Sequence, residues 1–389
     1  MATLVLTAVG TAIGGPIGGA IGSLFGQAAD QRLFAPRGRT GARVTDLRLQ
    51  TSSYGTPIAR IIGAMRVAGT IIWATDLVEH RHRSGAKGRA GTTSYTYSAS
   101  FAVALSSRRV AGLGRIWAEG NILRGAAGDW KTPVTMRFHN GDADQNVDPL
   151  IAAAEGAAHC PAYRGIAYAV FEDMDLSPYG NRIPSFSFEL LDDAGVDRTM
   201  ADVVADVVGD RIGPVHAAPG APGLTGYAVD GPTRRDALEP LADILPIDAW
   251  ADPADGQTRW RVGDDGTAPV ATLPAIAADQ GRARAEWRRG AADAVPARIC
   301  VGGYDPARDY QIGTQSEQVP GGRGADQRIA MPIAISADDG KALAAYLATR
   351  RAVAGEQLVW PTGFAALALA PGARVNTAVD GPAYRVAER

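Results

Sequence analysis

The stretch TTSYTYSASFAVAL, residues 92–105, decides the fold class of this chain. It is rich in threonine, tyrosine, serine, phenylalanine and valine, and the β-branched and aromatic residues among them favour extended backbone. It therefore predicts one long strand. Before it, residues 58–73 are broken by Gly63 and Gly69, which predicts two or three short strands with tight turns. After it, four more segments have the composition of strands: residues 114–123, 134–138, 166–172 and 185–191.

The composition agrees with a β-rich, folded protein. Of the 389 residues, 46% are hydrophobic and 21% are charged, which is typical of a soluble globular protein and excludes a disordered chain. The 47 glycines and 24 prolines favour a turn-rich β protein over a helical bundle. The length predicts two or three domains. A formal net charge of −2 indicates no general attraction to nucleic acid or to an anionic membrane.

A short helix interrupts the strands of the first half. Residues 148–157 have helical spacing, with Asn146 or Asp148 as the N-cap and Gly156 at the end. Many short strands, one helix and no alternation of strand and helix predict a mainly β fold. We expect a barrel or sandwich with this helix inserted.

The second half follows a linker at residues 213–226 that is rich in proline, glycine and alanine. Helices are expected from Thr199, from Thr233 and from Ser336, whose serine and two following acids suit a helix amino terminus. Short strands are expected at residues 260–262, 295–302, 329–335, 358–360 and 384–386. The predicted organisation has four parts: an apolar amino-terminal segment (1–34), a barrel-like domain (35–198), a helix and linker (199–225), and an α+β barrel-like domain (226–389).

The amino-terminal segment has an unusual glycine pattern. Gly14, Gly18, Gly22 and Gly26 recur every four residues, so on a helix they form a stripe without side chains. Such a helix, expected from Pro16 onward, is weak in water because each glycine costs about 1 kcal/mol relative to alanine. Close packing against a symmetric partner helix or a membrane would compensate. The hypothesis is a channel plug that can enter a membrane; the alternatives are a buried intradomain helix and a disordered tail.

A basic segment, HRHRSGAKGRAG, occupies residues 80–91 and is predicted to be a flexible loop. Its cations are Arg81, Arg83, Lys87 and Arg89. They predict an arm that grips a neighbouring subunit or faces DNA in a channel, and a solvated hairpin tip remains an equal alternative. His80 and His82 share one face of an extended chain, but no third ligand is near, so we expect no metal there.

The sequence carries no recognisable catalytic motif. The two cysteines, Cys160 and Cys300, lie far apart in the sequence and form no disulfide framework or four-cysteine metal site. Glu172, Asp173 and Asp175 cluster, but acids beside a strand turn are usually solvated. The sequence contains no phosphate loop and no Gly-x-Ser-x-Gly elbow. The expectation is therefore a non-enzymatic protein without a cofactor or metal.

Several motifs resemble one family of proteins. They are SYGTPIARIIGAMRVAGTIIW (53–73), YTYSASFAVAL (95–105), GRIWA (114–118), PAYRGIAYAVFEDMDL (161–176), YGNRIPSFSFE (179–189), DGPTRRDALEPL (230–241), YDPARDYQIGTQ (304–315), PGARVN (371–376) and DGPAYRV (380–386). Together they resemble the large tail-tip hub of gene transfer agents and related siphophages, which is similar to the host-specificity protein J of lambda-like phages. The glycine-rich amino terminus fits the gene transfer agent branch.

The resemblance implies a structural role at the tip of a phage-type tail. It implies a homotrimer whose two barrel-like domains make a ring of six. This ring would cap a hexameric tail tube or distal tail protein and adapt sixfold to threefold symmetry. The implied partners are the tape measure protein, other baseplate proteins, DNA passing through the channel and the host membrane during entry. The alternatives from other classes are a tail-associated peptidoglycan hydrolase and a membrane pore.

The chain departs from the family in two respects. Hubs of gene transfer agents carry a glycosidase-like barrel between the two halves, and the linker here is far too short to hold one. The resemblance therefore implies no peptidoglycan cleavage. The family normally continues beyond the strand that ends near Arg389, so we expect a minimal hub or a fragment of a longer one.

Overall fold

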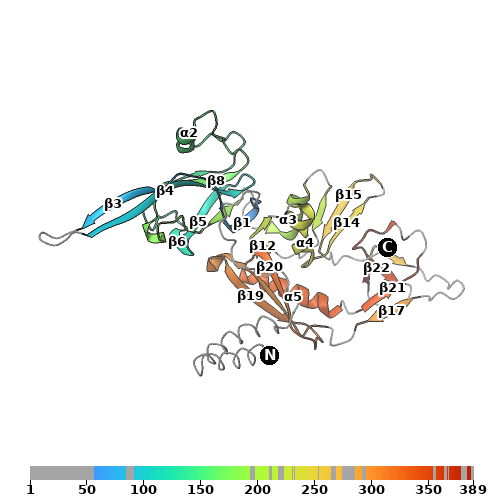
Figure 1. Ribbon diagram of the computed structural model, residues 1–389. Helices are drawn as coiled ribbons and strands as arrows, with labels where there is room; N and C mark the ends of the chain where they lie inside the picture. Colours follow the sequence, from blue (N-terminus) through green and yellow to red (C-terminus); the bar gives the residue numbers. More distant parts are fainter. Residues whose placement is uncertain are drawn as a thin grey trace, which may run out of the picture. The chain divides into compact units, whose positions relative to one another are not determined.

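The computed structural model places these strands and helices in three dimensions (Figure 1). The residues that it describes all lie in the compact unit Val44–Arg389. They are residues 57–84, 92–192, 198–209, 213–217, 223–229, 231, 233–252, 254–263, 269–273, 285–290, 295–353, 356–362, 366, 368–377 and 383–386.

The protein is mainly β. A five-stranded sheet is built around the long strand β4, with neighbours β2, β8 and β7 in the order β2-β4-β8-β7, and β3 also pairs with β4. The bounds are β2 Thr70–Ala74, β3 Val78–Ser84, β4 Thr92–Ser106, β7 Thr135–His139 and β8 Ala167–Asp175. The predicted strand at residues 92–105 is confirmed, because β4 covers all of it.

An eight-stranded sheet runs through both halves of the sequence, in the order β19-β18-β20-β13-β1-β9-β5-β6. Its first-half strands are β1 Arg60–Ala68, β5 Gly112–Ala118, β6 Asn121–Arg124 and β9 Phe186–Leu191. Its second-half strands are β13 Gly226–Val229, β18 Arg298–Asp305, β19 Gln311–Gln318 and β20 Gln327–Ala334. Both described large sheets end in free edge strands and neither closes on itself, so the mainly β class is confirmed and the two barrels are not.

Smaller elements complete the described chain. The short strands are β10 Arg198–Thr199, β11 Val215–Ala217, β12 Gly223–Leu224, β14 Ile247–Ala251, β15 Thr258–Val262, β16 Ala271–Leu273, β17 Glu286–Arg289, β21 Glu356–Val359, β22 Arg374–Thr377 and β23 Tyr384–Arg385. The helices are α2 Pro149–Glu155, α3 Met200–Val208, α4 Arg234–Ala242 and α5 Ala337–Val353, with 3₁₀ turns η1 Ser177–Tyr179 and η4 Pro306–Arg308.

Strand β1 connects the two halves of the eight-stranded sheet. Residues 60–63 pair with β13 and residues 64–68 pair with β9. The change of partner occurs at Gly63, which has a φ of 73° and lies opposite Gly226 in β13. A Cβ on Gly226 would stand 2.0 Å from the carbonyl oxygen of Ala64, so the two backbones approach too closely for any side chain. The proposed domain boundaries remain a prediction, and the sheet is continuous across them.

The described residues form two large hydrophobic cores and one small one, which packs around Ile151 of α2. The first contains four stacked phenylalanines, with Phe171 placed 5.0 Å from Phe101 and 4.8 Å from Phe186 between ring centres. Each such ring stabilises the fold by about 1.5–3 kcal/mol through burial. In the second core, Leu343 and Leu347 of α5 are buried together with strand residues such as Ile299.

Helix caps follow the predicted polar residues. Thr199 and Thr233 both form capping boxes, with Asp202 and Asp236. Ser336 accepts a hydrogen bond from the amide of Asp339 at the start of α5. Of the two candidates for α2, the structure selects Asp148, which accepts from the amides of Leu150 and Ile151.

The structure differs from the prediction for the basic segment and does not cover the amino-terminal one. His80–Ser84 were expected in a flexible loop, but they belong to strand β3 and pair with residues 92–96 of β4, so the interpretation as a loop was wrong for them. The reason is cross-strand pairing with the long strand, which overrides their polarity. The amino-terminal helix predicted to carry Gly14, Gly18, Gly22 and Gly26 falls outside the described residues and stays a prediction. Among the described helices, none is long and apolar enough to cross a membrane.

Candidate functional site

The turn after β18 contains two consecutive non-glycine residues in left-handed backbone. Asp305 accepts a hydrogen bond from the amide of Ala307 and so starts the 3₁₀ turn η4. Asp309 and Tyr310, which follow it, have φ values of 54° and 59°. Non-glycine residues in this left-handed region are strained by about 1 kcal/mol or more each. Such a conformation persists only where the surroundings hold it.

Arg115 of β5 holds this turn from the other half of the chain. It forms a two-pronged ion pair with Glu189 of β9, with Nη2 2.7 Å from Oε1 and Nε 2.9 Å from Oε2. It also donates to Oδ1 of Asp309 at 2.6 Å and to the carbonyl of Pro306 at 3.0 Å. One guanidinium therefore connects β5, β9 and the η4 turn.

A second arginine reinforces the same contact. Arg66 of β1 donates to the hydroxyl of Ser187 and to the carbonyl oxygen of Asp309, both at 2.8 Å. Its guanidinium lies 3.9 Å from the ring centre of Trp117, a cation–π contact. The hydroxyl of Tyr310, a residue with 2% of its surface exposed, donates to Oε1 of Glu189 at 3.0 Å.

We call Arg66, Arg115, Glu189, Asp309 and Tyr310 the arginine lock. Burial by itself would raise the pKa of Glu189, but the hydrogen bonds and charge of Arg115 outweigh it and hold that pKa below its usual value. Burial lowers the pKa of Arg66, and burial beside Glu189 raises the pKa of Tyr310. The ion pair with Arg115 therefore favours the ionised form of Glu189. Each charged group of the arginine lock is paired with another group of the protein. The arrangement therefore suits holding the η4 turn against β5 and β9 better than it suits proton transfer.

The residues of the arginine lock lie in the motifs that resemble tail-tip hubs, but the sequence did not predict that they contact one another. Arg115 lies in the segment 114–118, Glu189 ends the segment 179–189, and Asp309 and Tyr310 lie in 304–315. The one feature of the sequence that pointed to them is that an arginine and a glutamate, Arg115 and Glu189, stand within otherwise apolar strands. Their partners are up to 194 positions away, so no local pattern could pair them.

The predicted basic residues lie on and beyond the hairpin of β3 and β4. Arg81 is exposed on β3, Arg83 is on the same strand, and Lys87 and Arg89 lie outside the described residues. His80 and His82 each bond a hydroxyl across the hairpin. In the described part of the chain, no group of three or more histidines, cysteines or carboxylates is placed to hold a metal ion.

The predicted acidic cluster is divided among separate partners. Glu172 pairs with Arg137, Asp173 accepts from the hydroxyl of Ser98, and Asp175 accepts from Ser177. The structure thus gives each carboxylate a local structural role. Of the cysteines, Cys160 is buried and Cys300 half-buried, and both are free thiols. Burial raises the pKa of Cys160, which disfavours the reactive thiolate.

Comparison with known proteins gives this architecture a context. The family model described as a putative phage tail protein matches residues 233–388. In a solved virion of a native gene transfer agent particle, one chain is 28% identical to this one, with a TM-score of 0.72, over 98% of this chain and 93% of that chain. These two matches support a tail protein of the phage and gene transfer agent type. It belongs in the tail of the virion.

Two other comparisons add nothing to that conclusion. A crystal structure of a tail protein from Neisseria meningitidis MC58 is 14% identical, over 72% of this chain and 78% of that chain. Its TM-score of 0.31 is too low to carry an argument. None of the curated proteins matches the sequence significantly.

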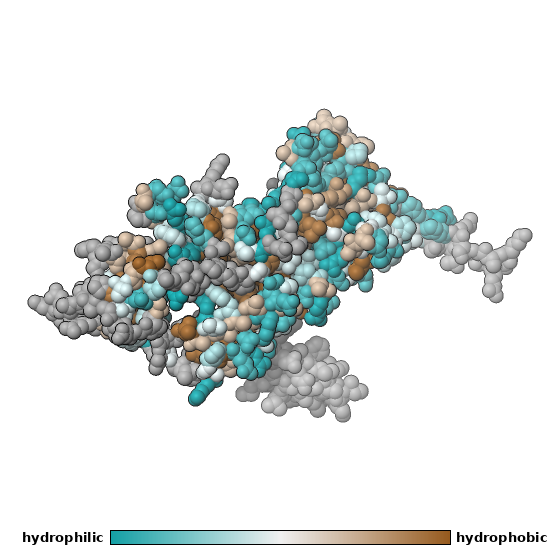
Figure 2. Space-filling model, turned by 180° about the vertical axis from the view of Figure 1, so that it is seen from behind, coloured by the Kyte–Doolittle hydropathy of each residue, from teal (hydrophilic) through white to brown (hydrophobic). Residues whose placement is uncertain are grey.

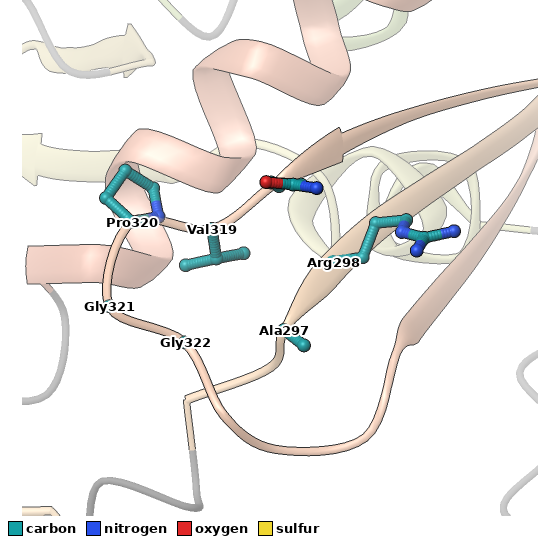
Figure 3. A pocket seen from close by; sticks show the side chains of 7 residues that line it. Ala297, Arg298, Val319, Pro320, Gly321 and Gly322 are labelled. Carbon is teal, nitrogen blue, oxygen red and sulfur yellow. The ribbon is translucent and has the colours of Figure 1, made fainter.

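A shallow, open pocket lies among the described residues at the start of β18 (Figure 3). It has a volume of about 490 Å³ and lies where the turn after β19 meets the start of β18. Its lining residues are Ala297, Arg298, Gln318, Val319, Pro320, Gly321 and Gly322. Arg298 is the one charged residue among them, and a single cation without a nucleophile or acid–base partner supports no catalytic assignment.

A second polar cluster fastens the inserted helix α2 to its sheet. Asp148, whose side chain is fully buried, accepts from Nε of Arg137 at 2.8 Å and lies 3.0 Å from Nε2 of His139. The same carboxylate caps α2. Burial alone would raise the pKa of Asp148, but its bonds to Arg137 and His139 prevail and lower that pKa.

Replacing this carboxylate is expected to loosen the inserted helix. Asp148→Ala should lower the free energy of unfolding by about 2–3 kcal/mol, because it removes a helix cap and leaves Arg137 without its buried partner. Asp129→Ala is the matched control: Asp129 pairs with Lys131 while half exposed to water, so its replacement should cost much less stability than that of Asp148. Urea denaturation of both variants provides the comparison, and equal losses would contradict the assigned role of Asp148.

Proposed function

We propose that this tail protein is the structural hub of the tail tip. Three copies would form a ring that caps the tail tube, adapts its sixfold symmetry to threefold symmetry and opens for DNA delivery. The observation that carries the proposal is the match to a chain of a gene transfer agent virion, which extends over 98% of this chain. The motifs of residues 161–176 and 179–189, which resemble the tail-tip hub, support the position at the tip.

The arginine lock supports a mechanical role. A hub transmits force between the tube and the distal tail, so its two halves need a rigid connection. Here they are joined by a shared sheet through β1, by the ion pair of Arg115 with Asp309 and by the hydrogen bond from Tyr310 to Glu189. The two-pronged pair of Arg115 with Glu189 is shielded from water at both partners, and such a pair is geometrically selective, which favours one fixed position of the Arg115 guanidinium.

The oligomeric state tests the proposal. Native mass spectrometry of the purified full-length chain should show a species with three times the mass of the chain. Mixed with its tail-tube protein, the chain should appear by electron microscopy as a cap at one end of each tube. The proposal would be wrong if the chain stayed a monomer and never docked onto tubes.

A degradation assay with purified peptidoglycan separates the hub from the enzymatic alternative. A hub has no catalytic requirement, so the full-length chain should release no soluble fragments above the level of a heat-treated sample. Fragment release that scales with protein concentration would instead support a tail-associated hydrolase.

A further inference from the structure

The hairpin of β3 and β4 projects beyond the rest of its sheet (Figure 1). We call residues 78–84 and 92–98 the ribbon. Strand β2 pairs with β4 only at residues 101–104, and β8 joins it only from Ser98 onward. Residues 92–96 therefore pair with β3 alone among the described strands, whereas the carbonyl of Tyr97 accepts a hydrogen bond from the amide of Leu176. Two-stranded ribbons are marginally stable by themselves and need further contacts.

The ribbon has two chemically different faces, because directly opposite residues of an antiparallel pair point to the same side. One face carries histidine and hydroxyl side chains together with the half-exposed Val78, which lies opposite Ser98. Its members satisfy one another: Nε2 of His80 lies 2.7 Å from the hydroxyl of Ser98, and Nε2 of His82 lies 2.8 Å from that of Thr96. This face needs no partner for its polar groups.

The other face is different and is called the tyrosine–arginine face. Register places Glu79 opposite Tyr97 and Arg81 opposite Tyr95. Tyr97 donates to Glu79 at 3.0 Å, whereas Tyr95 is 46% exposed and Arg81 is exposed beside it. Tyrosine and arginine are the residue types that contribute most often to the binding energy of protein interfaces. An exposed pair of them on a projecting ribbon indicates a docking surface.

The charge and hydropathy of the ribbon indicate which kind of surface it can bind. Residues 78–98 contain four basic side chains and one acidic one, a formal charge of +3, while the whole chain carries −2, so the remainder carries −5. The surface of the projecting hairpin is mostly hydrophilic (Figure 2), which fits a polar protein surface and not a lipid interior. The acidic remainder of an identical chain is therefore a complementary partner that is always present in an oligomer.

We propose that the tyrosine–arginine face of the ribbon docks on the acidic body of a second copy of this chain. The inference rests on the proposed oligomeric hub and adds the element that connects neighbouring copies. A contact between the ribbon of one copy and the body of the next is head-to-tail, and three such contacts close a ring. Tyr95 would be the central anchor and Arg81 its charged neighbour.

Site-specific photo-crosslinking tests the contact in the assembled, full-length protein. A photoreactive phenylalanine analogue replaces Tyr95 in one sample and His82, exposed on the opposite face, in the control. Tyr95 should give an adduct with twice the mass of the chain, at least fivefold more abundant than from His82. Equal yields at the two positions, an adduct with another tail protein only, or no adduct would each overturn the proposal.

A charge-reversal variant gives an independent readout. Arg81→Glu combined with Tyr95→Ser should weaken self-association at least about 30-fold, because truncated hot-spot residues typically cost 2 kcal/mol or more. Both side chains are exposed, so the melting temperature of the monomer should stay unchanged, and His82→Ala serves as the control. Unchanged association would overturn the proposal. If the wild-type protein is a trimer but position 95 gives no crosslinked adduct, only this contact is refuted. If position 95 gives the adduct in an assembly that is not a trimer, only the proposed ring is refuted.

Discussion

Arg115→Met should lower the free energy of unfolding by about 3–5 kcal/mol. Arg115 is 16% exposed and its partner Glu189 is 14% exposed, so the substitution leaves a shielded carboxylate without its cation. Removal of one partner from such a pair costs far more than the pair contributes, because the remaining charge is uncompensated. The η4 turn loses its bonds at Pro306 and Asp309 as well. Guanidinium chloride denaturation monitored by tryptophan fluorescence measures the loss.

The same substitution at a solvent-exposed pair provides the control. Arg182 pairs with Glu119 at 3.2 Å with two thirds of its side chain exposed, so Arg182→Met should cost less than about 1 kcal/mol. The double variant Arg115→Met with Glu189→Leu should recover part of the stability, because it removes the orphaned charge. A loss below about 1 kcal/mol for Arg115→Met alone would show that the lock is not a significant fastening.

Gly226→Ala should lower the free energy of unfolding by about 3 kcal/mol through a single added methyl group. The new Cβ would stand 2.0 Å from the carbonyl oxygen of Ala64, and this neighbour is backbone that is held by strand pairing. The two strands must separate to make room, which breaks the sheet where its halves join. Overpacking of a rigid site has costs of this size.

Gly112→Ala is the matched control for that experiment. Gly112 begins strand β5, and a Cβ built on it meets no atom within 4 Å. The alanine there should change stability by less than about 1 kcal/mol, and in the stabilising direction if it restricts the unfolded chain. Thermal denaturation of the two variants in parallel gives the comparison. Equal stabilities would mean that β1 and β13 can move apart freely.

The sheet-forming segments were largely predictable from local pattern. Residues 92–105 and 166–172 are rich in β-branched and aromatic side chains, and both appear as central strands of one sheet. The helix starts at Thr199 and Ser336 were also predictable, because a capping residue acts on amides within its own first turn. In contrast, QIGTQSEQ at residues 311–318 has little apolar alternation, and its place as edge strand β19 follows only from pairing with β18.

The functional surfaces were predictable in composition but not in geometry. The basic segment at residues 80–91 was recognised from its charges, yet its two faces depend on the register of β3 against β4. The sequence predicted that Tyr95 lies in a strand, but it did not predict that its side chain is exposed, because exposure is a property of the folded chain. The arginine lock was missed for the same reason: Arg115 and Asp309 are adjacent only after the two halves have joined.

The amino-acid sequence by itself determined a mainly β, turn-rich protein, the positions of its capped helices and its resemblance to tail-tip hubs. These properties depend on side-chain pattern and on bonds within a few residues. The tertiary structure decided that the sheets stay open, that β1 changes partner at Gly63 and that Arg115, Glu189 and Asp309 meet. Those features depend on which distant segments exclude water together, and a local sequence pattern does not encode that choice.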